Sequence, residues 1–238
     1  MIEQLDLGGI SVDVLKKDIK NVHLSVHPPT GRVRISAPLR MGTDTIRVFA
    51  IAKLGWIKQH QQKLRVQERE TPREYIDRES HFLWGKRYLL KIEDAATRPG
   101  VELRHNNIIL RVRNDAGHTK KQDVLDEWYR NQVKTAAMPI MQKWERLIGV
   151  KANKFFVQRM KTRWGSCNAV ARSVRVNSEL AKKPVECLEY IIVHELSHLR
   201  EPTHNRRFIE LMDQFLPDWQ HRRDVLNRLP VRHESWKY

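Results

Sequence analysis

The segment His194-Glu195-Leu196-Ser197-His198 constrains the fold of this chain more than any other. Two histidines four positions apart lie on the same side of an α-helix, so both imidazoles can reach one ion only if this segment is helical. Glu195 projects about 100° around the helix from His194. Its carboxylate therefore lies beside such an ion, where it can deprotonate a water molecule. We expect His194 and His198 to be metal ligands and Glu195 to be the general base.

The surrounding residues predict the helix that this motif needs, over residues 184–199. Pro184 is suited to the first turn of a helix. Four apolar residues then repeat on one side of the helix, which predicts a buried face: Leu188, Ile192, Leu196 and Leu199. Pro202 disfavours the helical conformation at Glu201, so we expect the helix to end soon after His198.

A third histidine, His204, follows within reach of the same ion. Three protein ligands with a fourth position open are typical of a catalytic zinc site, because a structural site fills all four positions. The alternative is a helix with incidental histidines, which is common for a lone HExxH and is disfavoured by the third histidine. We therefore expect one zinc ion per chain, bound by His194, His198 and His204.

The spacing of the three histidines matches the metzincin pattern, but two other features of that pattern are missing. Metzincins place a glycine midway between the last two ligands, where this chain has Glu201. Met212 does not predict a Met-turn either, because it lies in a run with helical periodicity from His204 to Phe215. The chain is therefore not expected to be a true metzincin.

Composition restricts the setting in which this site works. The chain has 238 residues, contains no run of 18 apolar residues and begins without a signal-peptide pattern. We expect no membrane segment and a cytoplasmic location. The two cysteines, Cys167 and Cys187, do not form a CxxC pair, so we expect reduced thiols and assign them no chemistry.

The chain is strongly basic, with 44 Lys and Arg against 28 Asp and Glu and a formal net charge of +16. Such a charge attracts polyanions and phosphorylated molecules. The alternative is a solvated basic surface, because the charges are scattered through every segment. No homeodomain, zinc-finger or RNP motif is present. No pattern specifies an oligomeric state.

The hydropathy pattern predicts an α+β chain with two regions, beginning with a mainly β region over residues 1–115. A turn at 28–31 separates the first strands, and one helix is expected over 43–67. A charged linker or loop follows at 68–79. Strands in this region are expected at 22–26, 33–36, 82–85, 87–92 and 108–112.

Residues 116–238 are expected to form the metal-binding domain. A long amphipathic helix is predicted over 120–147, with Pro139 as the point of a kink. Short strands at 155–158 and 173–177 precede the metal-binding helix, which we expect to pack on the long helix and on a small sheet. We expect Ser173–Asn177 to be the exposed edge strand, able to pair with an extended peptide.

A second motif, Arg159-Met160-Lys161-Thr162-Arg163-Trp164-Gly165-Ser166-Cys167, precedes the metal-binding helix. With this motif, Val174-Arg175-Val176-Asn177, Tyr190–Leu199 and His204-Asn205 with Phe208, the chain resembles the YgjP-like metallopeptidase domain family, which is related to the WLM and SprT-like zincins. The resemblance implies a zincin-like catalytic domain. It also implies a single zinc on His194, His198 and His204, with Glu195 as the catalytic acid and base.

The second motif also supplies candidate substrate-binding residues. If it is extended, Arg159, Lys161 and Arg163 share one face. Cations beside a metal suit an anionic substrate or a charged transition state. The alternative is that they pair with surface carboxylates, or that Arg163 stacks on Trp164. We add Arg175 and Asn177, from the neighbouring strand, as candidate substrate-binding residues.

Three functions are compatible with these residues. The first is a zinc peptidase in which Glu195 transfers the proton of the attacking water to the leaving amine. The second is a nucleoside triphosphate pyrophosphohydrolase that uses zinc or magnesium and binds phosphate through Arg159, Lys161 and Arg163, although no P-loop is present. The third is a nucleic-acid-binding protein with a vestigial metal site. Glu195 argues against the third, because a binding protein has no need of a general base.

Overall fold

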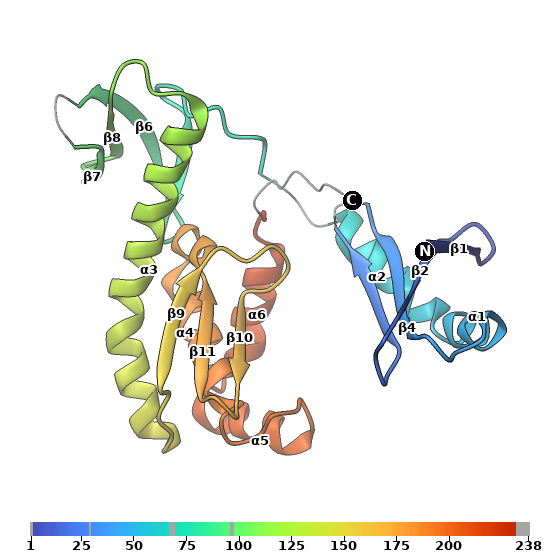
Figure 1. Cartoon of the computed structure of the whole chain (residues 1–238). Helices are drawn as coiled ribbons and strands as arrows, with labels where there is room; N and C mark the ends of the chain where they lie inside the picture. The colour runs from blue at the N-terminus through green and yellow to red at the C-terminus, as the bar shows by residue number, and fades with distance from the viewer. Residues whose placement is uncertain (1, 29, 67–69, 96–97, 232–238) are drawn as a thin grey trace. The chain divides into compact units, whose positions relative to one another are not determined.

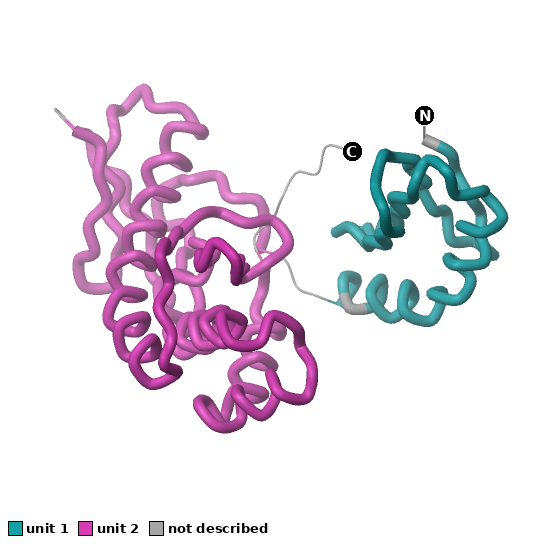
Figure 2. The backbone as a smooth tube through the Cα atoms, turned by 60° about the horizontal axis from the view of Figure 1, so that its bottom comes forward, with its two compact units in different colours: residues 1–69, 233–238 teal, residues 70–232 magenta. Residues whose placement is uncertain are grey.

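A computed structural model describes residues 2–28, 30–66, 70–95 and 98–231. The chain combines helices with three small β-sheets, which confirms the α+β class. Two compact units form: unit 1 contains residues 1–69 and 233–238, and unit 2 contains residues 70–232 (Figure 2). The boundary expected between residues 115 and 116 falls inside unit 2, because the sheet before it packs on the long helix after it.

Unit 1 is a four-stranded sheet with two helices. Its elements are β1 (Ile2–Asp6), β2 (Ser11–Lys17), β3 (His23–His27), β4 (Arg32–Pro38), α1 (Thr43–Ala52) and α2 (Leu54–Val66). The strand order is β1-β2-β4-β3. Because β2 and β4 pair in parallel, the sheet is not a simple series of antiparallel hairpins. Alternate residues of the strands, including Val12 and Ile35, share a buried core with Ile46 and Ile57 of the helices.

The single helix expected over residues 43–67 is wrong, because the structure has two helices in this range. Lys53 follows α1 with φ of −104° and ψ of 5°, outside the helical region. Gly55 comes at the start of the next helix, and glycine has a poor helix propensity. Residue 67 and the beginning of the expected linker lie outside the described residues.

Unit 2 begins with a second sheet of the same strand order. Its strands are β5 (Ser80–Leu83), β6 (Lys86–Asp94), β7 (Gly100–Arg104) and β8 (Asn107–Val112), arranged β5-β6-β8-β7. Trp84 and Gly85 both have positive φ, at 50° and 77°, as a tight turn between antiparallel strands requires. The expected strand at 82–85 therefore ends at Leu83. Leu90, Leu110 and Leu125 belong to the core between this sheet and the next helix.

That helix, α3 (His118–Ile148), is the longest of the described elements. It continues through Pro139 and ends at Gly149, which has a left-handed φ of 72°. Its buried side includes the row Tyr129, Val133, Ala137, Met141 and Trp144. This row packs in the core that also holds the helix with His194, and Figure 1 shows α3 running along the side of this unit.

The third sheet contains β9 (Lys154–Gln158), β10 (Gly165–Asn168) and β11 (Ser173–Asn177) in the order β10-β11-β9. The expectation that Ser173–Asn177 forms an exposed edge is wrong: β11 is the central strand, with β10 antiparallel on one side and β9 parallel on the other. β10 is an edge strand of this sheet and contacts the helix that carries His194.

A short 3₁₀ helix (Ser178–Lys182) leads from β11 to α4 (Val185–Ser197), which packs against α3, β10 and β11. Two helices complete unit 2: α5 (Arg206–Phe215), within the expected helical run, and α6 (Trp219–Arg228), which the sequence pattern did not predict. In the described part of the chain, none of the helices has the length and apolar character needed to span a bilayer.

Candidate active site

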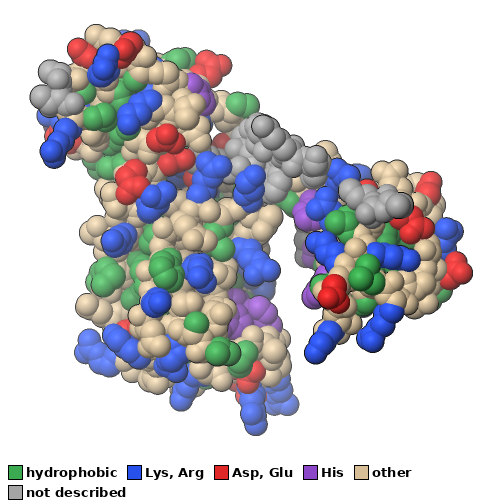
Figure 3. Space-filling view, in the orientation of Figure 1, with side chains coloured by type: hydrophobic (Ala, Val, Ile, Leu, Met, Phe, Trp, Pro, Cys, Tyr) green, Lys and Arg blue, Asp and Glu red, His purple; other side chains and the backbone are tan. Residues whose placement is uncertain are grey.

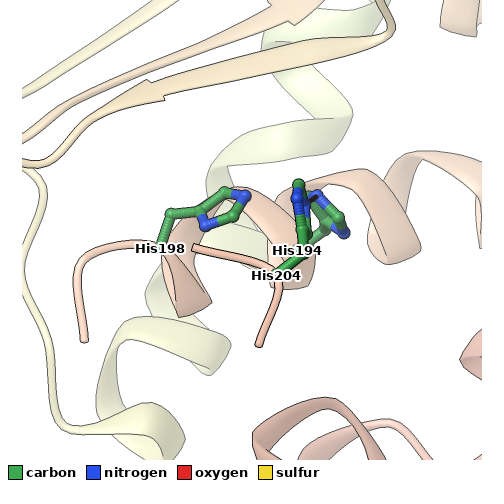
Figure 4. Close-up of side chains that lie close together, drawn as sticks. All are labelled: His194, His198 and His204. Atoms are coloured by element: carbon green, nitrogen blue, oxygen red, sulfur yellow. Dashed lines mark hydrogen bonds between the residues drawn. The ribbon is translucent and has the colours of Figure 1, made fainter. Parts of the chain in front are cut away.

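Three histidines converge at the end of α4. His194 lies in its last turn, His198 directly follows it, and His204 comes from the turn before α5. One ring nitrogen of each lies within 4.8 Å of the others (Figure 4). The Nε2 atoms of His194 and His204 are 2.9 Å apart, while nitrogens that share one tetrahedral zinc lie about 3.3 Å apart. The three side chains therefore form a donor set that fits one zinc ion.

Contacts around the rings fix their orientation. The Nδ1 atom of His198 lies 3.1 Å from the carbonyl oxygen of Glu201, which leaves Nε2 directed to the site. Phe208, only 3% exposed, packs against all three imidazoles, with ring centroids 4.9, 4.6 and 4.8 Å from those of His194, His198 and His204. Asn205 caps α5 by accepting a hydrogen bond from the Phe208 N–H. This cap stabilises the first turn of α5, which carries Phe208.

The surroundings of His194 disfavour its protonated form. Burial, together with the smaller effect of the neighbouring His198 and His204, lowers its pKa to about 3. Burial also lowers the pKa of His198. Both rings are therefore neutral near pH 7, which is the form that binds a metal. The Nδ1 atom of His194 is buried and has no hydrogen-bond partner among the described residues.

Glu195 is only 5% exposed, and its carboxyl lies beside β10. Burial raises its pKa to about 8, and the positive charge of Arg163 partly opposes this effect. A divalent cation on the histidines would also favour the carboxylate and lower the pKa. Burial and a bound cation therefore act in opposite directions on the pKa of Glu195. A carboxyl group with such balanced influences is suited to accept a proton and return it near neutral pH.

A cavity of about 420 Å³ opens between these side chains and β10. The histidines and Glu195 line one side, Gly165, Ser166 and Cys167 line the other, and Arg163, Ala169 and Pro202 complete the lining. Burial and the charge of Glu195 raise the pKa of Cys167 to about 11, so its thiol is protonated and a poor nucleophile at neutral pH. This agrees with the absence of an assigned role for Cys167.

The second sequence motif does not form an extended strand over residues 159–163, so the condition for a shared face of its cations is not met. Residues 159–164 form an irregular segment between β9 and β10, so Arg159, Lys161 and Arg163 do not share a strand face. Arg159 lies 3.5 Å from Asp126 of α3. Arg163 lines the cavity.

The other two candidate residues, on β11, lie differently. Asn177 is 4% exposed and forms hydrogen bonds to the backbone of Met160 and Arg163. Arg175 pairs in register with Ser166 and lies 5.1 Å from the ring of Phe156. Because side chains alternate along a strand, Arg175 projects from the opposite face to Gly165. It therefore points away from the face that packs against Glu195.

Sequence reasoning missed two residues that shape the site. The family resemblance includes Phe208 without giving it a role, although its position four residues after His204 is a signal that it lies near that histidine. Gly165 packs directly against Glu195, and nothing local distinguishes it from the other glycines of the chain. Only the pairing of β10 with β11 brings it to α4.

The basic surface is not concentrated at one place in the face shown by Figure 3. Lys and Arg side chains lie on both units there, and the Asp and Glu side chains of unit 2 lie mainly toward its upper end in this view.

A helix that carries two histidines and a buried glutamate beside a third histidine and an open cavity is the arrangement of a metal-dependent hydrolase. The chain belongs to the YgjP-like metallopeptidase domain family, whose pattern matches residues 20–229. Membership of this family implies a divalent metal, and a peptide substrate fits a metallopeptidase.

Two solved structures of archaeal metallopeptidase zymogens are similar to parts of the chain. They are abylysin of Pyrococcus abyssi, with 16% identity and a TM-score of 0.35, and jannalysin of Methanocaldococcus jannaschii, with 18% identity and a TM-score of 0.34. Each similarity covers 37% of this chain, and 89% and 90% of the respective zymogen chains. A search of the curated proteins found no match.

Proposed function

We propose that this protein is a zinc-dependent peptidase in which His194, His198 and His204 hold one zinc ion. The observation that carries this proposal is the convergence of three imidazole nitrogens within 4.8 Å next to the buried carboxyl of Glu195. When bound, zinc would supply Lewis acidity, which polarises a carbonyl group and makes water more acidic.

In this proposal Glu195 moves the proton during peptide hydrolysis. Its carboxylate accepts a proton from the attacking water and then donates it to the amine nitrogen that leaves. Burial of Glu195 supports this role, because a site that excludes bulk water strengthens electrostatic interactions with the reacting groups.

The edge of β10 supports an extended peptide as the substrate. The N–H of Asn177 donates to the carbonyl of Trp164, at 2.8 Å, and these two residues directly flank the opposed pair Gly165 and Val176. Hydrogen-bonded pairs alternate along such a ladder, so the backbone groups of Gly165 and Cys167 point away from β11. A peptide can therefore add to β10 as a further strand along the cavity.

The nucleoside triphosphate alternative, with its zinc or magnesium, has less support. Arg163 lines the cavity, but Arg159 lies beside Asp126. A triphosphate needs several converging cations, as in known phosphoryl-transfer sites. A peptide needs only a strand edge and the metal centre.

The test is metal-dependent cleavage of a peptide library by the zinc-loaded protein, analysed by mass spectrometry and compared with Glu195→Gln. We expect cleavage by the wild type and a loss of at least about a thousandfold in the variant. Glu186→Gln is the matched control, because Glu186 is an exposed glutamate in the first turn of the same helix. Phosphate or pyrophosphate release from nucleotides that depends on Glu195, without peptide cleavage, would reject the proposal.

A further inference from the structure

We infer that Arg163, positioned by Asn177, binds a carboxylate of the substrate next to the scissile bond. The preferred substrates are then peptides with an acidic side chain, or a free C-terminal carboxylate, at that position. This inference rests on the proposed peptidase function and adds a substrate class to it.

Arg163 is available to a ligand. Its side chain lines the cavity together with Glu195 and the three histidines. Within the described residues, no ion pair or hydrogen bond engages its guanidinium. Among the described residues that line the cavity, Glu195 is the one carboxylate, and the proton transfer already uses it.

Asn177 holds the backbone from which Arg163 projects. Its side-chain amide donates hydrogen bonds to the carbonyl oxygens of Met160 and Arg163, both at 2.8 Å. Its side-chain oxygen accepts from the N–H groups of Met160 and Glu179, both at 3.2 Å. With these contacts the buried amide is fully used, which leaves it unable to bind substrate directly. Asn177 is therefore a positioning residue for the segment that carries Arg163.

The chemistry of a single guanidinium favours a carboxylate. The planar fork of arginine matches the two oxygens of a carboxylate in a bidentate pair. One arginine cannot balance the charge of a triphosphate. A peptide that runs along β10 passes the start of that strand, close to Arg163. A carboxylate on such a peptide thus reaches a cation that has no partner among the residues described by the structure.

The experiment uses the zinc-loaded full chain and a peptide whose cleavage site has been identified from the library. Three forms are compared: one with Glu near the scissile bond and blocked ends, one with Gln there and blocked ends, and one with Gln and a free C-terminal carboxylate near the bond. We expect the wild type to prefer one carboxylate form over the blocked Gln form by about tenfold in kcat/KM, mainly through KM. The form that is preferred identifies the source of the carboxylate.

Arg163→Gln should reduce this preference to less than about threefold, and Arg163→Lys should restore part of it, because lysine keeps the charge but not the fork. Arg175→Gln is the control: Arg175 lies on the other face of the sheet against Phe156, and the preference should remain. Asn177→Ala should weaken the preference through KM. Circular dichroism shows whether the Asn177→Ala variant folds. If it does not, the carboxylate preference of the Arg163 variants alone tests the inference.

A binding measurement complements the kinetics. In a Glu195→Gln background, the Glu peptide or the free-carboxylate peptide should bind about tenfold more weakly after Arg163→Gln, by fluorescence anisotropy. Cleavage without a carboxylate preference, a preference that survives Arg163→Gln, or an equal loss of kcat on all three peptides would overturn the inference and leave the peptidase function in place. Absence of metal-dependent cleavage of any peptide would overturn both.

Discussion

Gly165 on β10 and Glu195 on α4 are in direct contact, and the contact leaves no room for a side chain at residue 165. A Cβ atom added to Gly165 would lie 2.5 Å from Oε1 and 2.8 Å from Cγ of Glu195. An added methyl group would therefore displace the Glu195 carboxyl, which lines the cavity together with Gly165. The glycine of the second motif thus sets how closely β10 approaches the proposed general base.

Gly165→Ala is therefore expected to impair catalysis without loss of metal. The methyl group displaces the Glu195 carboxyl, and misplacing a reacting group by about 1 Å can cost about a hundredfold in rate. We expect kcat for peptide cleavage to fall by about that factor and the free energy of unfolding to fall by about 1–3 kcal/mol. The zinc content, measured by mass spectrometry, should stay near one per chain.

Gly100→Ala is the matched control for this experiment. Gly100 begins β7 in the same unit, and a Cβ there meets no atom within 4 Å. The Gly100→Ala variant should retain wild-type activity. Full activity in Gly165→Ala would mean that the contact with Glu195 does not constrain the base.

Phe208 is expected to control metal affinity, because it packs against all three proposed ligands. Phe208→Leu leaves the ligands in place but removes the flat surface that orients their rings. Loss of outer contacts typically weakens metal binding by about 10- to 100-fold. Competition with a zinc chelator measures this change. Phe215→Leu, at the other end of α5 and also packed on the unit 2 core, should keep wild-type affinity. Equal affinities in the two variants would contradict this role.

The site could be predicted where its geometry is local. His194, Glu195 and His198 lie within about one turn of one helix, so the spacing alone predicts their arrangement. His204 could be expected nearby because the chain must turn after Pro202. The helix itself was predictable from its apolar row, most of which is buried in α4.

The wall of the cavity could not be predicted in the same way, since it depends on which strands pair. The hydropathy of Ser173–Asn177 suits either an edge strand or a central strand. The sequence contains no local signal that β9 pairs in parallel with β11 and covers its second edge. The same non-local pairing brings Gly165 to Glu195 and turns Asn177 into an anchor for the segment at Arg163.

Removal of His204 tests whether it is the third ligand. With two histidines left, the ion loses one protein ligand, and we expect His204→Ala to purify with substantially less than one zinc per chain and to lose peptide cleavage. His221→Ala is the control, because His221 is an exposed histidine of α6 in the same unit. Unchanged zinc content in His204→Ala would exclude His204 as a ligand.

The free energy of unfolding is expected to depend on pH through Glu189, whose side chain connects α4 to α3 and α6 by hydrogen bonds. Its carboxylate accepts hydrogen bonds from Lys143 and Trp144 of α3, at 2.9 and 2.8 Å, and from Arg222 of α6, at 2.7 Å. Burial acts to raise the pKa of Glu189, but these hydrogen bonds outweigh it and lower the pKa to about 2, from a usual value of 4.5.

A carboxyl whose pKa is lowered by folding stabilises the folded state above its unfolded pKa and loses this effect as the pH falls through its folded pKa. The contribution of Glu189 is therefore complete above about pH 5 and disappears between pH 4.5 and 2. Glu189→Gln should lower the free energy of unfolding at pH 7 by about 1–2 kcal/mol, a value reduced for solvent screening. Urea titrations of chelator-treated protein from pH 7 to pH 2 measure the difference, which should shrink toward pH 2, whereas Glu186→Gln should follow the wild type throughout. A constant difference over this range would mean that the charge of Glu189 does not stabilise the contact of α4 with α3 and α6.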